Sequence, residues 1–215
     1  MVQVKIFPVN ILEENTYVVF DETKEAVIID CGTLVDAERK MVDDFIADNG
    51  LKVKYLLQTH AHFDHLFGAD HIYNKYGVKP RMNPNDLPTY RMANEQMLMF
   101  MHRAFDLTLP PHDTDFLDAD TVISFGSHQL RVFPTPGHTP GGICFYEATE
   151  HLLFSGDSLF RGSVGRTDLP GGNMLELLKA LKHLLEILPE DTVVYPGHGP
   201  STTIGDEKKY NNYIA

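Results

Sequence analysis

A run of seven residues, Thr-His-Ala-His-Phe-Asp-His at positions 59–65, constrains this chain more than any other feature. It directly follows a short apolar segment that has the character of a buried strand. Side chains two positions apart in an extended segment point the same way, so His60 and His62 can meet at one ion. Asp64 and His65 lie past the bend and can face a second point nearby. Imidazole nitrogens and carboxylate oxygens are ligands that zinc, iron and manganese accept.

A purely structural explanation of the same run is available. Asp64 could cap a helix over residues 66–76, which would leave the histidines merely exposed. Four potential ligands within six residues, placed after a buried strand, favour the metal site instead, because functional residues concentrate in the loops at strand ends.

Three later turns each carry one more potential ligand. His138 lies within the sequence Pro-Gly-His-Thr-Pro-Gly, Asp157 follows Ser-Gly at the end of an apolar segment, and His198 stands between two glycines. Each of these alone has the composition of an ordinary turn. Together they repeat one arrangement, in which a ligand lies after a predicted strand or in the turn that leads into one. The full set is His60, His62, Asp64, His65, His138, Asp157 and His198.

These motifs, in this order and spacing, resemble the metallo-β-lactamase superfamily over nearly the whole chain. The resemblance is strongest to the glyoxalase II-like (hydroxyacylglutathione hydrolase-like) branch, as seen in Asn15-Thr16-Tyr17 and in the Gly-Asp-Ser-Leu-Phe segment that contains Asp157. It implies an α/β fold, a four-layer αββα sandwich, with the metals at one edge between the sheets. We expect one such domain over residues 1–215, since no linker or internal repeat interrupts the pattern.

The resemblance also assigns the ligands to two sites. Site one would be formed by His60, His62 and His138, and site two by Asp64, His65 and His198, with Asp157 bridging them. A carboxylate has two oxygens, so seven ligands are enough for two ions. We expect two divalent ions, Zn²⁺ in the first place, with iron or manganese as alternatives.

Hydrophobic periodicity predicts strands alternating with helices. We expect strands at 16–20, 26–30, 53–58, 121–125, 129–133, 143–147, 152–155 and 192–195. We expect helices at 35–48, 66–76, 89–105 and 173–187. The helix over 89–105 is rich in methionine and could pack over the core, form a lid or bind a partner. A homodimer through it is one hypothesis.

Two metal ions lower the pKa of bound water to about 7, which makes a bridging hydroxide the expected nucleophile on a carbonyl carbon. Asp64 and Asp157 are the expected catalytic carboxylates. A thiolate leaves readily because the pKa of a thiol is about 8.5. The expected activity is therefore hydrolysis of a thioester, such as S-D-lactoylglutathione or a related acyl thiol. Arg161 and Arg166 are candidate contacts to a carboxylate of the substrate.

Two differences from full-length glyoxalase II concern the use of glutathione as the thiol carrier of the substrate. That family has an aromatic contact two places beyond the basic residue that corresponds to Arg166, where this chain has Asp168. It also ends in a helical domain that the 17 residues after His198 cannot build. These differences concern the thiol carrier, whereas thioester hydrolysis does not depend on them.

The alternative activity is that of a mononuclear iron persulfide dioxygenase. That branch of the superfamily shares the histidine-rich run and much of the segment Gly-Arg-Thr-Asp at 165–168. It uses only the ligands that correspond to His60, His138 and Asp157, which leave positions open for O₂.

The net charge limits the classes of partner that the protein can bind. The chain has 18 Lys and Arg residues against 30 Asp and Glu, a formal charge of −12, which disfavours nucleic acid and anionic membranes as partners. No stretch approaches the length of a membrane span. Cys31 and Cys144 form no CxxC pattern and are expected in the core, as in a reducing, cytoplasmic protein.

Overall fold

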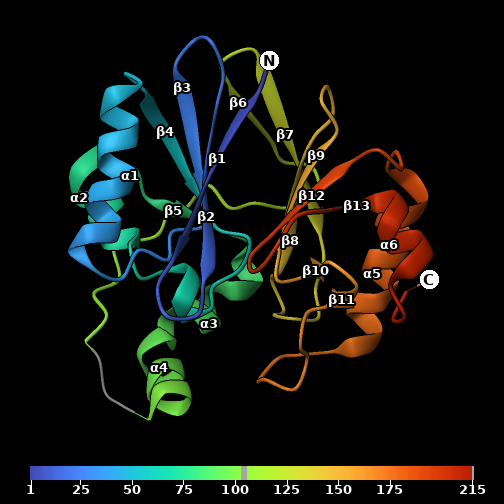
Figure 1. Cartoon of the computed structure of the whole chain (residues 1–215). Coiled ribbons are helices and arrows are strands. Elements are labelled where there is room, and N and C mark those ends of the chain that lie inside the picture. Colours follow the sequence, from blue (N-terminus) through green and yellow to red (C-terminus); the bar gives the residue numbers. More distant parts are fainter. Residues whose placement is uncertain (103–105, 215) are drawn as a thin grey trace.

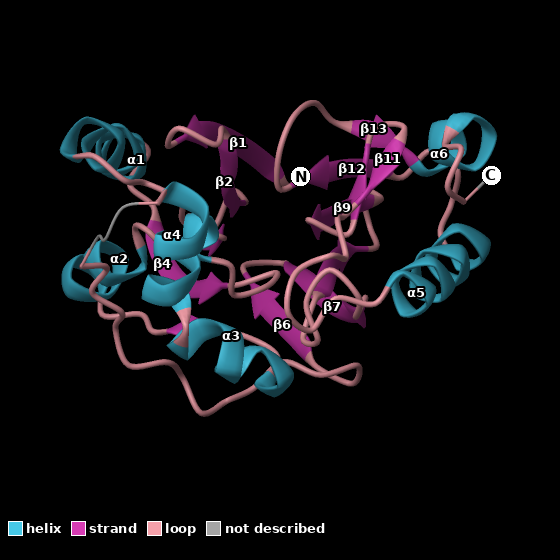
Figure 2. Ribbon diagram, turned by 90° about the horizontal axis from the view of Figure 1, so that it is seen from below, coloured by secondary structure: helices cyan, strands magenta, loops and turns pink. Residues whose placement is uncertain are grey.

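Two β-sheets face each other, and helices cover their outer sides. We describe them from a computed structural model that defines residues 1–102 and 106–214. Figure 1 shows α1 and α2 outside one sheet and α5 and α6 outside the other, and Figure 2 shows the same order of layers from below. The predicted αββα sandwich is confirmed.

The first sheet has the strand order β1-β2-β3-β4-β5. Its first three strands pair antiparallel, whereas β3, β4 and β5 pair parallel. The bounds are Gln3–Val9 for β1, Glu14–Phe20 for β2, Glu25–Ile29 for β3, Lys52–Leu57 for β4 and Pro80–Arg81 for β5.

The second sheet has the strand order β13-β12-β9-β8-β7-β6, and β12 and β9 form its parallel pair. Its strands are β6 (Val122–Phe125), β7 (His128–Pro134), β8 (Ile143–Glu147), β9 (Leu152–Gly156), β12 (Val193–Pro196) and β13 (Thr202–Thr203). The short strands β10 (Leu159–Phe160) and β11 (Ser163–Val164) form a separate hairpin.

The hydrophobic core lies between the sheets and beneath each helical layer. Along β2, Tyr17 and Val19 join the core between the sheets, whereas Val18 and Phe20 face the layer that contains α1 and α2. A strand buried on both faces needs a continuous apolar run, and β2 and β3 have one. Alternate residues of β2 therefore contribute to two different cores.

The helices begin and end where local residues dictate. Asn173 caps α5 by accepting hydrogen bonds from the backbone N–H groups of Leu175 and Glu176. The helix bounds are Asp36–Asp48 for α1, Ala69–Tyr76 for α2, Leu87–Arg91 for α3, Ala93–Met101 for α4, Met174–Ile187 for α5 and Ile204–Tyr210 for α6. Among the residues that the structure defines, no helix is both long and apolar enough to cross a membrane.

Two predicted helices differ from the structure. The helix expected over 66–76 begins at Ala69, because Phe63–His65 forms a separate 3₁₀ turn and Gly68 occupies the N-cap position. Asp64 therefore does not cap this helix. The methionine-rich segment forms two short helices, α3 and α4, which are separated at Met92. Residues 103–105, the end of the helix predicted there, lie outside the described ranges.

Candidate metal centre

The seven predicted ligands follow four strands whose ends lie at one edge of the sandwich. Four of them lie in the segment after β4, and one each follows β7, β9 and β12. The structure brings all seven together, although 138 residues separate His60 from His198 in the sequence (198 − 60 = 138).

The first group contains His60, His62 and His138, whose ligand atoms lie within 4.8 Å of one another. Nδ1 of His62 and Nε2 of His138 are 2.9 Å apart, and all three rings are buried. The outer nitrogens are held by the protein. Nδ1 of His60 lies 3.1 Å from the hydroxyl of Thr59, and Nδ1 of His138 donates to the carbonyl oxygen of Arg166 at 2.7 Å. The inner nitrogens therefore point at a common centre.

The second group contains Asp64, His65 and His198. Nε2 of His198 lies 3.2 Å from Oδ2 of Asp64, and Nε2 of His65 lies 3.8 Å from the same oxygen. Both rings are again held from behind. His65 donates through Nδ1 to Asp30 at 2.9 Å, and His198 donates through Nδ1 to the carbonyl oxygen of Leu12 at 2.9 Å.

Asp157 lies between the two groups. Its Oδ2 is 3.5 Å from Nε2 of His138 in the first group and 3.7 Å from Nε2 of His198 in the second. Its Oδ1 is 3.5 Å from Nε2 of His65. The two oxygens of one carboxylate therefore face both groups, which is the position a bridging ligand needs.

Unpaired polar atoms test whether these residues fit metal ions. Nε2 of His60, Nε2 of His65 and Oδ1 of Asp157 are buried without a hydrogen-bond partner among the described residues. Buried polar atoms are almost always paired, so these three atoms indicate ligands of an ion. Gly197 supports the same conclusion, because a Cβ there would collide with Oδ1 of Asp157 and lie 2.8 Å from Cε1 of His65. The residues fit a pair of divalent ions.

Burial keeps the imidazoles of His60 and His62 neutral, which is the form that binds metals. It lowers the pKa of His60 well below its usual value. Burial, with His138 nearby, lowers the pKa of His62 to about 3. Metal binding at this group therefore does not have to displace protons from these two rings.

The second group has the opposite character, because carboxylates surround its imidazoles. Burial lowers the pKa of His198, but the hydrogen bond with Asp64 and the charge of Asp157 raise it to about 9. Burial likewise lowers the pKa of His65, yet Asp30, Asp64 and Asp157 raise it well above its usual value. The neighbouring carboxylate of Asp157 shows the matching effect. Burial raises its pKa, but the interaction with His65 outweighs burial and holds the pKa well below its usual range. The cluster thus attracts positive charge.

Two further acids support the ligands, and the sequence reasoning missed both. Asp30 follows β3 and is buried, and its carboxylate accepts from the backbone N–H of Thr59 at 2.8 Å and from its hydroxyl at 2.7 Å, besides His65. The available signal was its position at the end of an apolar strand. Its partner His65 lies 35 residues away, a distance over which local patterns say nothing.

The second of these acids is Asp86, which is fully buried. It accepts from the N–H of Ala61 at 2.9 Å, from the hydroxyl of Thr139 at 2.8 Å and from the N–H of Gly141 at 2.6 Å. One carboxylate thus joins the loop of His60 and His62 to the loop of His138. In the sequence this acid is only the last residue of a turn.

The two candidate arginines have different surroundings. The guanidinium of Arg166 forms a two-pronged ion pair with Asp168, at 2.7 and 2.8 Å, while its backbone holds His138. Arg161 is exposed in the turn between β10 and β11, and its neighbour Gly162 donates to Glu207 of α6. The backbone of Arg166 thus contacts the loop of His138, whereas the turn of Arg161 contacts α6. Cys31 and Cys144 are both buried and free, as expected.

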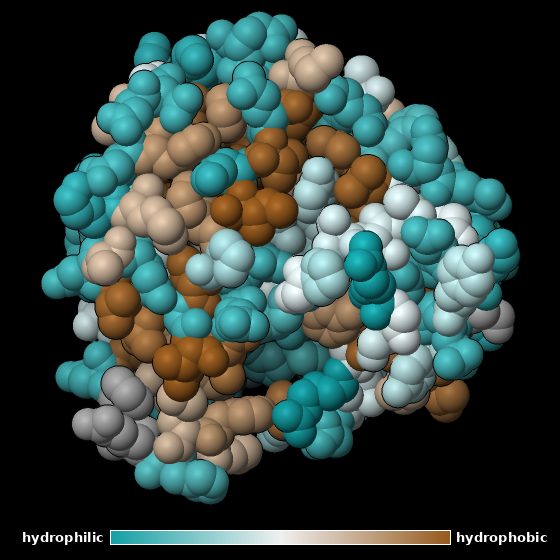
Figure 3. All heavy atoms as spheres, viewed as in Figure 1, coloured by the Kyte–Doolittle hydropathy of each residue, from teal (hydrophilic) through white to brown (hydrophobic). Residues whose placement is uncertain are grey.

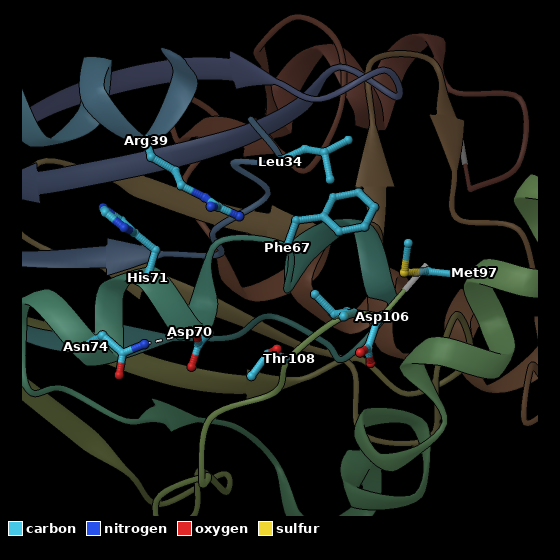
Figure 4. Close-up of a pocket in the computed structure, with 10 residues that line it drawn as sticks. Leu34, Arg39, Phe67, Asp70, His71, Asn74, Met97, Asp106 and Thr108 are labelled. Carbon is cyan, nitrogen blue, oxygen red and sulfur yellow. Dashed lines mark hydrogen bonds between the residues drawn. The ribbon is translucent and has the colours of Figure 1, made fainter. Parts of the chain in front are cut away.

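A separate cavity of about 330 Å³ lies beside α1 and α2 (Figure 4). Arg39 of α1 and Asp70 and Asn74 of α2 line it, and the amide of Asn74 donates to Asp70 at 2.9 Å. None of the seven ligands lines this cavity.

Two facing sheets with five imidazoles and two carboxylates at one edge define a metal-dependent hydrolase with a binuclear centre. The chain belongs to the metallo-beta-lactamase superfamily, whose pattern it matches over residues 10–198. The hydroxyacylglutathione hydrolase GloC of Haemophilus influenzae is 34% identical over 212 residues, which cover 98% of this chain and 97% of that protein. The resemblance to the hydroxyacylglutathione hydrolase-like branch is thus confirmed.

Solved structures agree with this assignment. The BLEG-1 B3 metallo-beta-lactamase superposes with a TM-score of 0.89 at 34% identity, over 99% of this chain and all of that one. TTHA1623, crystallised in a di-iron-bound form, superposes with a TM-score of 0.85 at 36% identity, over 98% of this chain and all of that one. The second of these relatives carries two metal ions in its structure.

Proposed function

We propose that this protein hydrolyses thioesters, such as S-D-lactoylglutathione or a related acyl thiol, with two divalent ions, Zn²⁺ in the first place. The observation that carries the proposal is the position of Asp157, whose carboxylate faces both ligand groups. The net charge of −12 favours a small-molecule substrate over nucleic acid or a membrane surface.

When bound, the two ions would supply a water of lowered pKa and draw electron density from the substrate's carbonyl oxygen. The protein's own residues prepare the site for this chemistry. His60 presents an unpaired nitrogen, the neutral ring of His62 lies beside His138, Asp64 offers an oxygen close to His198, and Asp157 lies between the two groups. Contacts from behind keep four of the rings in place, those of His60, His65, His138 and His198, so little reorganisation is needed during turnover.

The leaving group supports a thioester over an amide. An amine must gain a proton to leave, whereas a thiol has a pKa of about 8.5 and departs as a thiolate. Similarity to GloC, a hydroxyacylglutathione hydrolase, supports the same substrate class. Similarity to the BLEG-1 β-lactamase makes β-lactam hydrolysis the competing outcome that an assay must include.

The dioxygenase alternative would use only His60, His138 and Asp157. In this chain Asp64, His65 and His198 also bring their ligand atoms within 4.8 Å of one another. Nε2 of His65 is buried without a partner, which a mononuclear site would leave unexplained. The second group therefore supports hydrolysis with two ions.

The test combines metal quantification with a substrate panel. Purified protein would be assayed with S-D-lactoylglutathione, an acyl-coenzyme A thioester, a chromogenic β-lactam and glutathione persulfide, the last in an oxygen electrode. We expect thiol release from at least one thioester, with little β-lactam cleavage and no O₂ uptake. O₂ uptake on the persulfide, or efficient cleavage of the β-lactam alone, would overturn the proposal.

A further inference from the structure

A cleft of about 270 Å³ opens beside the metal centre, and His62 forms part of its wall. Residues of α3 and α4 form much of its lining, and the loops that contain Pro140 and Leu169 contribute further residues. Figure 3 shows hydrophobic side chains gathered at the lower edge of the molecule, where Figure 1 places α4. Apolar side chains in this wall are Pro88, Met92, Met99 and Phe100.

Several contacts hold α4 against the metal-binding loop. Oε1 of Gln96 accepts from the backbone N–H of Phe63 at 3.3 Å, and Nε2 of Gln96 donates to the carbonyl oxygen of Thr89 at 2.7 Å. The rings of Phe63 and Phe100 lie 5.6 Å apart. Because Phe63 lies between the ligands His62 and Asp64, this wall of the cleft has a defined position relative to the metal ligands.

The charge of the cleft indicates which groups it can accept. Among the residues that line it, Glu95 is the one acid, and no Lys or Arg is present. Arg166 lies nearby with its guanidinium 5.5 Å from the Phe100 ring, but Asp168 already pairs its charge. An anionic group would meet Glu95 without a compensating cation, whereas an uncharged hydrocarbon would bury against methionine and phenylalanine.

We infer that this cleft binds the acyl chain of the substrate and that the enzyme prefers thioesters with an uncharged, apolar acyl group of several carbons. The inference rests on the proposed thioesterase function, because it places the acyl carbonyl at the metal centre. A small hydroxylated acyl group such as lactoyl would leave most of the apolar wall without a contact. Met99 is 60% exposed in the structure, and a bound acyl chain would cover it.

The test is a series of thioesters that share one thiol: acetyl, butanoyl, hexanoyl, and a hexanoyl chain that ends in a carboxylate. Each buried methylene is worth about 0.8 kcal/mol, so we expect kcat/KM to rise by about fourfold per methylene up to hexanoyl. The carboxylate-ended chain should fall to the acetyl level or below. Equal rates for all chain lengths, or a preference for the charged chain, would overturn the inference.

A pair of variants on α4 localises the effect. Met99→Gln keeps the length of the side chain but makes it polar, and should reduce the gain per methylene to less than twofold. Leu98→Gln makes a similar change at an exposed position of the same helix that does not line the cleft, and should keep the wild-type gain. An equal response of the two variants would contradict the assignment.

A binding measurement separates this inference from the proposed function. Thioether analogues with S-methyl and S-hexyl groups cannot be hydrolysed, and calorimetry on the metal-loaded protein gives their Kd. We expect the hexyl analogue to bind at least tenfold more tightly, and Met99→Gln to remove most of that difference. Length-dependent binding without thioester cleavage would refute the function and keep the apolar cleft. Binding that does not depend on chain length would overturn the inference. If sedimentation then shows a dimer of the wild type that Met99→Gln dissociates, a second copy of the chain occupies the cleft.

Discussion

The carboxylate of Asp30 accepts a hydrogen bond from Nδ1 of His65 at 2.9 Å and so turns the other ring nitrogen toward Asp64 and Asp157. Asp30 itself is 1% exposed and is held by two further hydrogen bonds from Thr59. A strand end in the first sheet thereby sets the orientation of a ligand that follows a different strand.

Asp30→Asn should weaken metal binding at the second group. In either orientation of the asparagine amide, its N–H₂ group faces at least one of the three donors that now bind the carboxylate of Asp30. Loss of such a supporting contact typically costs about 10–100-fold in metal affinity. Competition with a chelator measures the affinity, and Asp44→Asn on the exposed face of α1 is the control. Unchanged affinity in Asp30→Asn would show that His65 does not need this support.

Asp86→Asn should lower both stability and activity. The substitution removes one acceptor from a buried site where three donors converge, which costs about 1–3 kcal/mol in the free energy of unfolding. The loops of His62 and His138 would lose their common anchor, so kcat should fall more than KM rises. Urea unfolding and steady-state kinetics check the two effects. A variant with normal kcat would refute the positioning role of Asp86.

Arg166→Ala should affect only substrates that carry a carboxylate. The guanidinium is exposed and paired with Asp168, so its contribution is that of a surface ion pair, up to about 1 kcal/mol. We therefore expect KM for S-D-lactoylglutathione to rise about two- to fivefold, with little change for a thioester without a carboxylate. If KM for each substrate in the variant equals its wild-type value, Arg166 does not contact the substrate.

Asp43 of α1 connects the two helices on one side of the molecule. It accepts hydrogen bonds from His71 at 2.9 Å, Lys75 at 2.7 Å and Tyr76 at 2.7 Å, all in α2. Burial raises the pKa of Asp43, but these three contacts outweigh burial and lower it. The ionised carboxylate therefore stabilises the fold above the unfolded-state pKa of about 3.9, and this stability is lost as the pH falls through the lower pKa of the folded state.

Asp43→Asn should thus cost about 1–3 kcal/mol at neutral pH, and the difference from wild type should shrink below roughly pH 4. Chemical denaturation at several pH values measures it. Asp44→Asn, one position along the same helix, should show no such dependence. A constant difference down to pH 3 would mean that the charge of Asp43 is not the cause.

The sequence could predict which seven side chains gather at the candidate metal centre, because they lie in short turns beside strands, where glycine, proline and histidine are conspicuous. It could not predict Asp30 or Asp86, since the partners of these acids lie tens of residues away and only tertiary contacts bring them together. The alternative interpretation of Asp64 as a helix cap does not hold, because Phe63–His65 forms a 3₁₀ turn and α2 begins only at Ala69. The break between α3 and α4 at Met92 could not be predicted either, because no proline or glycine lies next to Met92 in the sequence.

The most direct test of the account is the number of metal ions per chain in the wild type and in Asp157→Ala, measured beside thioester hydrolysis. Two ions per chain are expected in the wild type, and loss of metal together with activity in the variant, because one carboxylate faces both groups. One ion per wild-type chain, or full metal content and activity in Asp157→Ala, would contradict it.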